Sequence, residues 1–277
     1  MRSTVPLLVK LLAIAGFGIL YIPVMMMMIY SFNRGKLVSV WAGFSTKWYK
    51  ELWYDDVLLT ALYKSLLIGF SSATISTIFG LLIAIAFVRF AHFRGRLFLS
   101  LVASAPLVMP EAVTGLSMLL LFIAMEASFG WPSGRGVDTI MIAHATFGMC
   151  FAAVVIQTRL RDMDKSLEEA ARDLGGRQPF VFLSIILPLI LPSIIAAWLL
   201  SFTLSFDDLV IASFVSGPGS STLPIVIFSK IRLGVSPEIN AIATLMILTI
   251  SALVMIGSFL VLRRDGKKLS PLKKRRE

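Results

Sequence analysis

Three acidic residues attract attention because they lie in stretches that are otherwise uncharged. Glu111 follows Pro106 and Pro110, two prolines four apart that should break a helix. Asp207 and Asp208 end a run of 29 uncharged residues. A carboxylate near the centre of a membrane-spanning helix costs about 2.5–3.5 kcal/mol on insertion scales, so such residues are rare and tend to be functional. Because carboxylates attract ammonium groups, the three acids indicate a path or binding place for a cation.

A polar stripe leads toward the acidic pair. Four residues recur at steps of three and four and therefore share one helix face: Trp198, Ser201, Ser205 and Asp208. This face predicts the wall of an aqueous path. An alternative is that Asp207 and Asp208 simply lie at a membrane interface, or brace an outer gate by bonding to Lys230 or Arg232.

The sequence shows no recognisable catalytic motif. A P-loop needs Gly-Lys followed by Ser or Thr, but here Gly35-Lys36 precedes Leu37, and Gly266-Lys267 precedes Lys268. The two histidines form no HExxH motif, and Cys150 is the single cysteine. We therefore predict no catalytic residue, no metal site and no bound cofactor, and if the chain uses ATP, another protein must hydrolyse it.

The elements that position the acids are predicted to be membrane helices. Of the 277 residues 57% are hydrophobic and 15% charged, against about 25% charged in soluble domains. A helix needs roughly 20 apolar residues to cross a bilayer. Six gaps between charges are that long: 10–34, 64–89, 96–126 (interrupted once, by Glu111), 138–159, 177–207 and 238–263. The sequence predicts an all-α integral membrane protein, with residues 1–277 as one transmembrane domain.

The distribution of Lys and Arg predicts which way the chain crosses. Eighteen of the 26 basic residues fall on the side that holds both termini, including the basic tail 263–277. The positive-inside rule then places both termini in the cytoplasm. It also accounts for the net charge of +10 without a nucleic-acid partner. On the outer side, the sequence predicts one short helix among the aromatic residues of 41–54 and another near 225–233.

The segment 158–184, between the fourth and fifth predicted spans, is longer and more charged than a simple connection requires. Ser166 and Glu169 have the spacing of a capping box, and Gly175 can adopt the left-handed conformation that ends a helix. Pro179 suits the first position of a second helix. The segment therefore predicts an exposed, charged helix–turn–helix.

The residues of this loop also resemble a known motif. Glu169-Ala170-Ala171, three residues, Gly175, nine residues, Ile185, one residue and Leu187-Pro188 match the "EAA" loop of binding-protein-dependent ABC importer permeases. The resemblance implies the type I importer permease fold, and a loop that docks onto a separate ATPase subunit. We therefore call the segment 158–184 the coupling loop. The resemblance assigns that docking to six residues: Glu168, Glu169, Ala170, Ala171, Asp173 and Gly175.

Further stretches are similar to one subgroup of this family. Ser31-Phe32-Asn33, Trp41-Ala42-Gly43-Phe44-Ser45, Phe206-Asp207-Asp208 and the run from Gly234 to Asn240 resemble spermidine/putrescine permeases, above all the second permease subunit of a bacterial putrescine importer. The resemblance implies an inner-membrane polyamine importer with a second permease subunit, two ATPase subunits and a periplasmic polyamine-binding protein. Two alternatives stay open: an ABC permease for another small solute, and a secondary transporter.

Overall fold

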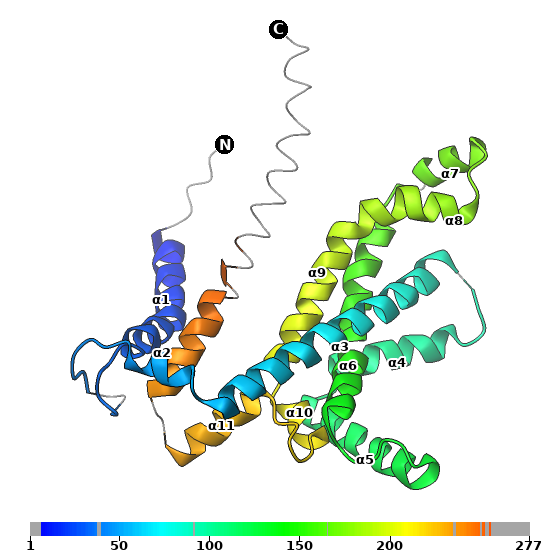
Figure 1. The fold of residues 1–277 in the computed structure, drawn as a ribbon. Helices are drawn as coiled ribbons and strands as arrows, with labels where there is room; N and C mark the ends of the chain where they lie inside the picture. The colour runs from blue at the N-terminus through cyan, green and yellow to red at the C-terminus, as the bar shows by residue number, and fades with distance from the viewer. Residues whose placement is uncertain are drawn as a thin grey trace. The chain divides into compact units, whose positions relative to one another are not determined.

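The computed structural model describes residues 7–37, 40–90, 92–164, 166–234, 237–249, 251–252 and 255. This part of the chain is helical and contains no β-strand, only an isolated bridge between Asn33 and Phe44. The helices are α1 Leu7–Tyr30, α2 Lys47–Leu52, α3 Asp56–Arg89, α4 Arg96–Val108, α5 Glu111–Phe129, α6 Val137–Arg161, α7 Ser166–Asp173, α8 Gln178–Val181, a π-helical turn Phe182–Ile186, α9 Leu187–Phe206, α10 Val210–Val215, α11 Leu223–Leu233 and a helix Pro237–Thr249 (Figure 1).

Within the described residues, five helices are long and apolar enough to cross a membrane. They are α1, α3, α5, α6 and the continuous run Gln178–Phe206. The sixth predicted span begins in the shorter helix Pro237–Thr249, and most of its remainder lies outside the described residues. The basic tail 263–277 also lies outside them, so the sixth crossing and the cytoplasmic placement of both ends stay predictions.

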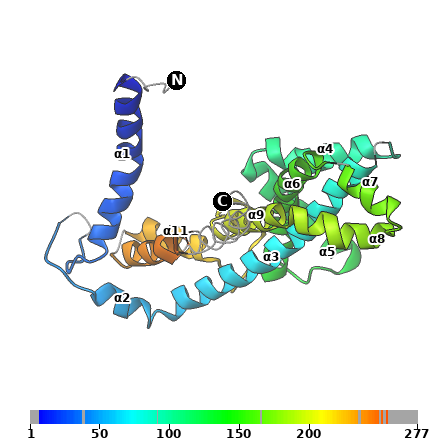
Figure 2. The same cartoon turned by 90° about the horizontal axis from the view of Figure 1, so that it is seen from above.

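The chain divides into two compact units, residues 1–56 with 229–277, and residues 57–228. The second unit holds the coupling loop and all three acids. Its core is the pair α6 and α9, which lie side by side in both views, with α7 and α8 at one end of the pair (Figures 1 and 2).

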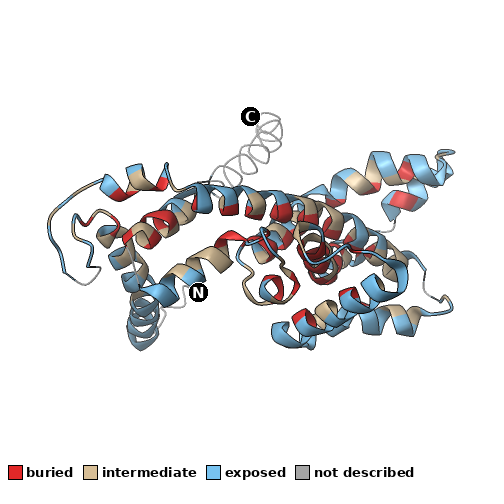
Figure 3. Ribbon diagram, turned by 60° about the horizontal axis from the view of Figure 1, so that its bottom comes forward, coloured by how far each residue is buried: buried red, intermediate tan, exposed pale blue. Residues whose placement is uncertain are grey.

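Small residues let α3 approach α6 closely. A Cβ atom on Gly80 would lie 2.6 Å from the Cβ of Ala152, and one on Gly148 would lie 2.6 Å from the Ser76 hydroxyl. Ser76 in turn donates a hydrogen bond of 3.0 Å to the carbonyl of Ala145. Small residues and hydroxyls of this kind are the usual means of helix association in lipid, where apolar burial gives little driving force. Buried residues accordingly follow the inner faces of α3, α6 and α9 (Figure 3).

Prolines interrupt two of the predicted spans. The span 96–126 breaks into α4 and α5, with Pro110 preceding Glu111 at the start of α5. The predicted break is present at Pro110, whereas Pro106, which was also expected to contribute, lies inside α4. The span 177–207 stays continuous but contains the π-helical turn Phe182–Ile186 directly before Pro188. Proline cannot donate the hydrogen bond that an α-helix requires at that position, and a π-helical turn is one way to accommodate the mismatch.

The first unit contains a loop organised around Asn33. The Asn33 side chain donates to the carbonyls of Leu37 and Val40 and accepts from the backbone N–H of Ala42, at 3.1, 2.7 and 2.8 Å. The indole of Trp48 in α2 donates to the Asn33 carbonyl at 2.6 Å. The two short helices predicted from sequence are present, as α2 and α11, although Trp48 is buried rather than lying at a free surface. Their placement on the outer side stays a prediction.

Candidate functional site

The coupling loop contains the predicted helix, α7, but its start differs from the prediction. Ser166 is the first helical residue, and its backbone N–H is accepted by the Asp164 carboxylate at 2.9 Å. The expected role of Ser166 as the capping residue is therefore wrong, because Asp164 supplies the acceptor. That backbone hydrogen bond, followed by one from the Ser166 side chain, lowers the pKa of Asp164 below its usual value.

The end of α7 is a tight glycine turn. Gly175 has a φ of +85°, as the sequence predicted. Its N–H donates to the Arg172 carbonyl at 2.8 Å, and the Gly176 N–H donates to the Ala171 carbonyl at 3.0 Å, which is the Schellman pattern. The next helix begins at Gln178, so Pro179 stands second in α8 rather than first. The turn therefore fixes the angle between α7 and the fifth span.

Glu168 connects α7 to the second span. Its side chain is only 12% exposed and forms ion pairs with Arg89, the last residue of α3, and with Arg172 at 2.7 Å. Nearby, Ala171 packs against a hydrophobic core that includes Leu160, Val181 and Ile186. The inner side of α7 is thus tied to the ends of α3, α6 and the run 178–206.

The outer side of α7 is open. Glu169, Ala170 and Asp173 are exposed, and so are the apolar side chains of Leu167 and Leu174. Leu174 is 90% exposed, which is unusual for a leucine beside a well-anchored helix. An exposed strip with apolar and acidic side chains on an anchored helix is what a protein partner can bind.

The three acids lie together at the end of the second unit where α9 finishes. Asp207 lies close enough to Asp208, Glu111 and His144 for their charges to act on it. Asp207 and Glu111 are exposed, whereas the Asp208 side chain is 8% exposed. The structure therefore brings the predicted acids together but gives Asp208 different surroundings from the other two.

Asp208 is held by a buried hydrogen-bond network. Its carboxylate accepts the N–H of Ala212 at 2.7 Å, which caps α10, and contacts His144 Nε2 at 3.1 Å. His144 Nδ1 lies 2.7 Å from the Ser205 hydroxyl, which lies 3.2 Å from that of Ser72. The network joins α3, α6, α9 and α10. Lys230, which the sequence offered as a partner for these acids, pairs instead with Asp55 and Glu238.

The remaining stripe residues contact neighbouring helices. Ser201 is buried and lies 3.4 Å from the Gly148 carbonyl, and the Trp198 indole donates to Thr74 at 3.1 Å. The rings of Trp198, Phe202 and Phe206 stack in succession with centroids 5.5 Å apart. In this conformation the stripe faces α3 and α6.

The family of this chain follows from comparison with known proteins. Residues 76–265 match the model of the family described as "Binding-protein-dependent transport system inner membrane component". That match covers more than half of the chain and includes the coupling loop and the acidic end. The chain belongs to this family.

Individual relatives agree with the family assignment. The chain is 50% identical over 261 residues to the putrescine transport system permease protein PotI of Escherichia coli K12, covering 94% of this chain and 93% of the relative. It is 40% identical over 254 residues to the spermidine/putrescine transport system permease protein PotC of the same strain, covering 92% and 93%.

A solved bacterial ABC transporter involved in the import of the polysaccharide alginate has the same fold, with a TM-score of 0.65 and 17% identity over 91% of this chain and 93% of that chain. This permease is a multi-pass inner-membrane protein of the ABC importer class. As in its family, its role is transport rather than catalysis.

Sequence reasoning missed the partners of two predicted site residues. Arg89 was counted only among the basic residues of one side, and His144 was considered only as one of two histidines that form no HExxH motif. Both lie far along the chain from the residues they bind, 79 positions from Glu168 and 64 from Asp208. His144 had one available signal, because an ionisable residue inside a membrane span usually has a partner.

Proposed function

We propose that this permease is one transmembrane subunit of an ATP-driven polyamine importer. It would form a heterodimer with a second permease subunit, bind two ATPase subunits on the cytoplasmic side, and receive polyamine from a periplasmic binding protein. The names of the relatives, together with 50% and 40% identity along nearly the whole chain, support putrescine or spermidine as the cargo. The excess of Lys and Arg on the side that holds both termini supports cytoplasmic ends.

The observation that carries the proposal is the two-sided character of α7. One side is tied to the membrane helices by Glu168 and Ala171, and the other offers Glu169, Ala170 and Asp173 to a partner. Gly175 sets the angle at which the helix is presented. When a bound ATPase moves α7, the ends of α3 and of the fifth span move with it, because α7 is attached to both.

Glu111 and Asp207 are the carboxylates we assign to the polyamine path. Both are exposed, both lie at the end of the unit where α9 finishes, and neither forms an ion pair with another described residue. We assign Asp208, Ser205, Ser201 and Trp198 to the wall behind them, where the first two belong to the His144 network. Opening of the path would then be a movement of this wall.

Co-purification tests the coupling assignment. The permease is co-expressed with its ATPase and second permease, and the ATPase retained on the tagged permease is quantified for wild type, Glu169→Lys and Ala170→Trp. Glu169→Lys reverses a charge and Ala170→Trp adds a bulky ring on the exposed side of α7, so both variants should lose most of the bound ATPase. Glu51→Lys in α2 is the matched control, since Glu51 forms only a solvent-exposed pair with Lys47. Normal ATPase retention by both α7 variants would reject the proposal.

Uptake in proteoliposomes tests the cargo. The assembled transporter should take up putrescine only with ATP and a loaded binding protein. Uptake without any ATPase would identify a secondary transporter. ATP-dependent uptake of an uncharged solute, with none of putrescine or spermidine, would identify a permease for a different cargo.

A further inference from the structure

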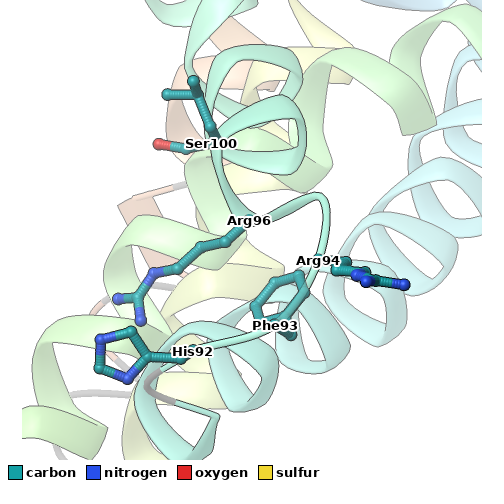
Figure 4. A pocket seen from close by; sticks show the side chains of 6 residues that line it. His92, Phe93, Arg94, Arg96 and Ser100 are labelled. Carbon is teal, nitrogen blue, oxygen red and sulfur yellow. The ribbon is translucent and has the colours of Figure 1, made fainter.

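A basic pocket lies in the connection between α3 and α4. It has a volume of about 700 Å³ and is lined by His92, Phe93, Arg94, Arg96, Leu97 and Ser100. The side chains of His92 and Arg96 extend toward the same side, while Arg94 extends to the other side of Phe93 (Figure 4). None of these residues takes part in the coupling loop or the acidic end, so the transport role described above leaves the pocket without a function.

The polar groups of the pocket suit an anionic oxygen ligand. Two guanidinium groups carry permanent charge and several N–H donors each. Arg96 donates a hydrogen bond of 3.3 Å to the Phe90 carbonyl, which restrains its side chain. Gly95 has a φ of +90° and is the N-cap of α4, a helix of 13 residues whose positive end faces the loop. Guanidinium groups beside a helix start form a common binding arrangement for phosphate.

The surroundings of the pocket distinguish a lipid from a soluble phosphate. Leu97 lines the pocket and is exposed, and Leu101 follows it one helical turn along α4 and is exposed as well, as are Phe98 and Phe90. The pocket also lies at the ends of two helices of predicted spans, beside the Arg89–Glu168 pair that anchors the coupling loop. A ligand with a negative head and apolar chains satisfies both parts of this surface.

We propose that this pocket binds the phosphate of an anionic phospholipid at the membrane surface on the coupling-loop side. The head group lies between Arg96 and His92, Arg94 adds positive charge from the other side of Phe93, and the acyl chains lie along Leu97 and Leu101. Each basic residue near a membrane surface contributes about 1 kcal/mol of attraction to anionic lipid, equivalent to about a fivefold change in binding. The site is independent of the transported solute.

Photo-crosslinking tests the proposal on the assembled transporter. The complex is reconstituted in vesicles that contain phosphatidylcholine and a photoactivatable phosphatidylglycerol in both leaflets, and labelled peptides are quantified by mass spectrometry. We expect wild type to be labelled in segment 92–101, and Arg94→Gln/Arg96→Gln to lose labelling there at least about fivefold. Arg159→Gln/Arg161→Gln, with equal charge loss and spacing at the end of α6 outside the pocket, should label as wild type.

Two further arms need no protein variant, so they remain informative if a variant assembles poorly. A photoactivatable phosphatidylcholine should label segment 92–101 several-fold less than phosphatidylglycerol, and equal labelling would overturn the proposal. Excess inorganic phosphate should leave the phosphatidylglycerol labelling intact. Its abolition by phosphate would identify a site for soluble anions instead.

Unchanged labelling in Arg94→Gln/Arg96→Gln, with loss of ATPase subunits from the complex, would make the pocket a subunit contact and also overturn the proposal.

Discussion

Glu168 of α7 forms an ion pair with Arg89, the last residue of α3. The pair joins the coupling loop to the end of a membrane-spanning helix that is 79 residues away in the sequence. A second partner, Arg172, lies on α7 itself and is more exposed. Of these two ion pairs, only the one with Arg89 links α7 to α3.

Removing Arg89 should impair transport more than removing Arg172. Arg89→Gln leaves a mostly buried carboxylate with one partner, and we expect uptake to fall about fivefold, equivalent to about 1 kcal/mol. Arg172→Gln breaks only an i,i+4 surface pair worth about 0.3–0.5 kcal/mol and should stay within about twofold of wild type. ATP-driven uptake in proteoliposomes measures both. Equal losses in the two variants would argue against a link through Arg89.

The glycine turn after α7 should tolerate different substitutions at its two positions. At Gly175 the space around a Cβ is open but φ is positive, so Gly175→Asn should be mild while Gly175→Val should cost about 1–2 kcal/mol or more. At Gly176 a Cβ would lie 2.7 Å from the Ala171 carbonyl oxygen, so even Gly176→Ala should displace the turn.

ATPase retention on the tagged permease provides the measurement for the turn variants. The expected order of retention is wild type, Gly175→Asn, then Gly176→Ala and Gly175→Val. If Gly176→Ala retained ATPase as well as wild type, the turn geometry would not matter for docking.

The sequence predicted those features that depend on local chemistry. Charge-free gaps located the long helices, Pro110 located the break before Glu111, and Gly175 located the end of α7. Each of these follows from helix length, a missing donor or a left-handed residue, all of which act within a few positions. The family motif then gave α7 its expected role.

Features that depend on tertiary contacts were beyond such reasoning. Nothing near Glu168 in the sequence indicates Arg89, and nothing near Asp208 indicates His144. Trp198, Ser201 and Ser205 lie on one face of α9 as predicted, but the helix ends at Phe206, so the expectation that Asp208 continues this face was wrong. A period of 3.6 also cannot say whether the face meets water or another helix. Here it meets α3 and α6. Ser166 was misplaced by one position because Asp164 competes as the capping acceptor.

Asp208 should behave as a structural residue and Asp207 as a path residue. Asp208→Ala removes the α10 cap and the His144 partner together, so we expect destabilisation of about 2–4 kcal/mol. Asp208→Asn keeps an oxygen for the Ala212 N–H and should be less damaging. Asp207→Asn should leave stability within about 0.5 kcal/mol of wild type, because its side chain is exposed, yet lower putrescine uptake.

Thermal unfolding of the purified complex and uptake at saturating ATP separate these roles. Glu111→Gln is expected to follow Asp207→Asn in both measurements. If Asp208→Asn and Asp208→Ala were equally stable and equally inactive, Asp208 would belong to the cation path and not to the cap. If Asp207→Asn transported putrescine normally, the assignment of Asp207 to the path would be wrong.

The ion pairs of Lys230 should make the stability of the first unit fall at alkaline pH. Its burial opposes the charged form, but the hydrogen bond and charge of Asp55 at 2.5 Å and the charge of Glu238 at 3.5 Å outweigh that and raise its pKa above the usual 10.5. Because the folded pKa lies above the unfolded one, this contribution is complete below pH 10.5 and is lost as pH rises through the raised pKa. The unfolding temperature of wild type should therefore exceed that of Lys230→Met at neutral pH, and the difference should shrink above pH 10.5.

Lys47→Met, which removes a lysine from the exposed pair with Glu51, should show little difference at any pH. A gap between wild type and Lys230→Met that stayed constant across the alkaline range would mean that the ammonium charge of Lys230 does not hold Asp55 and Glu238 together.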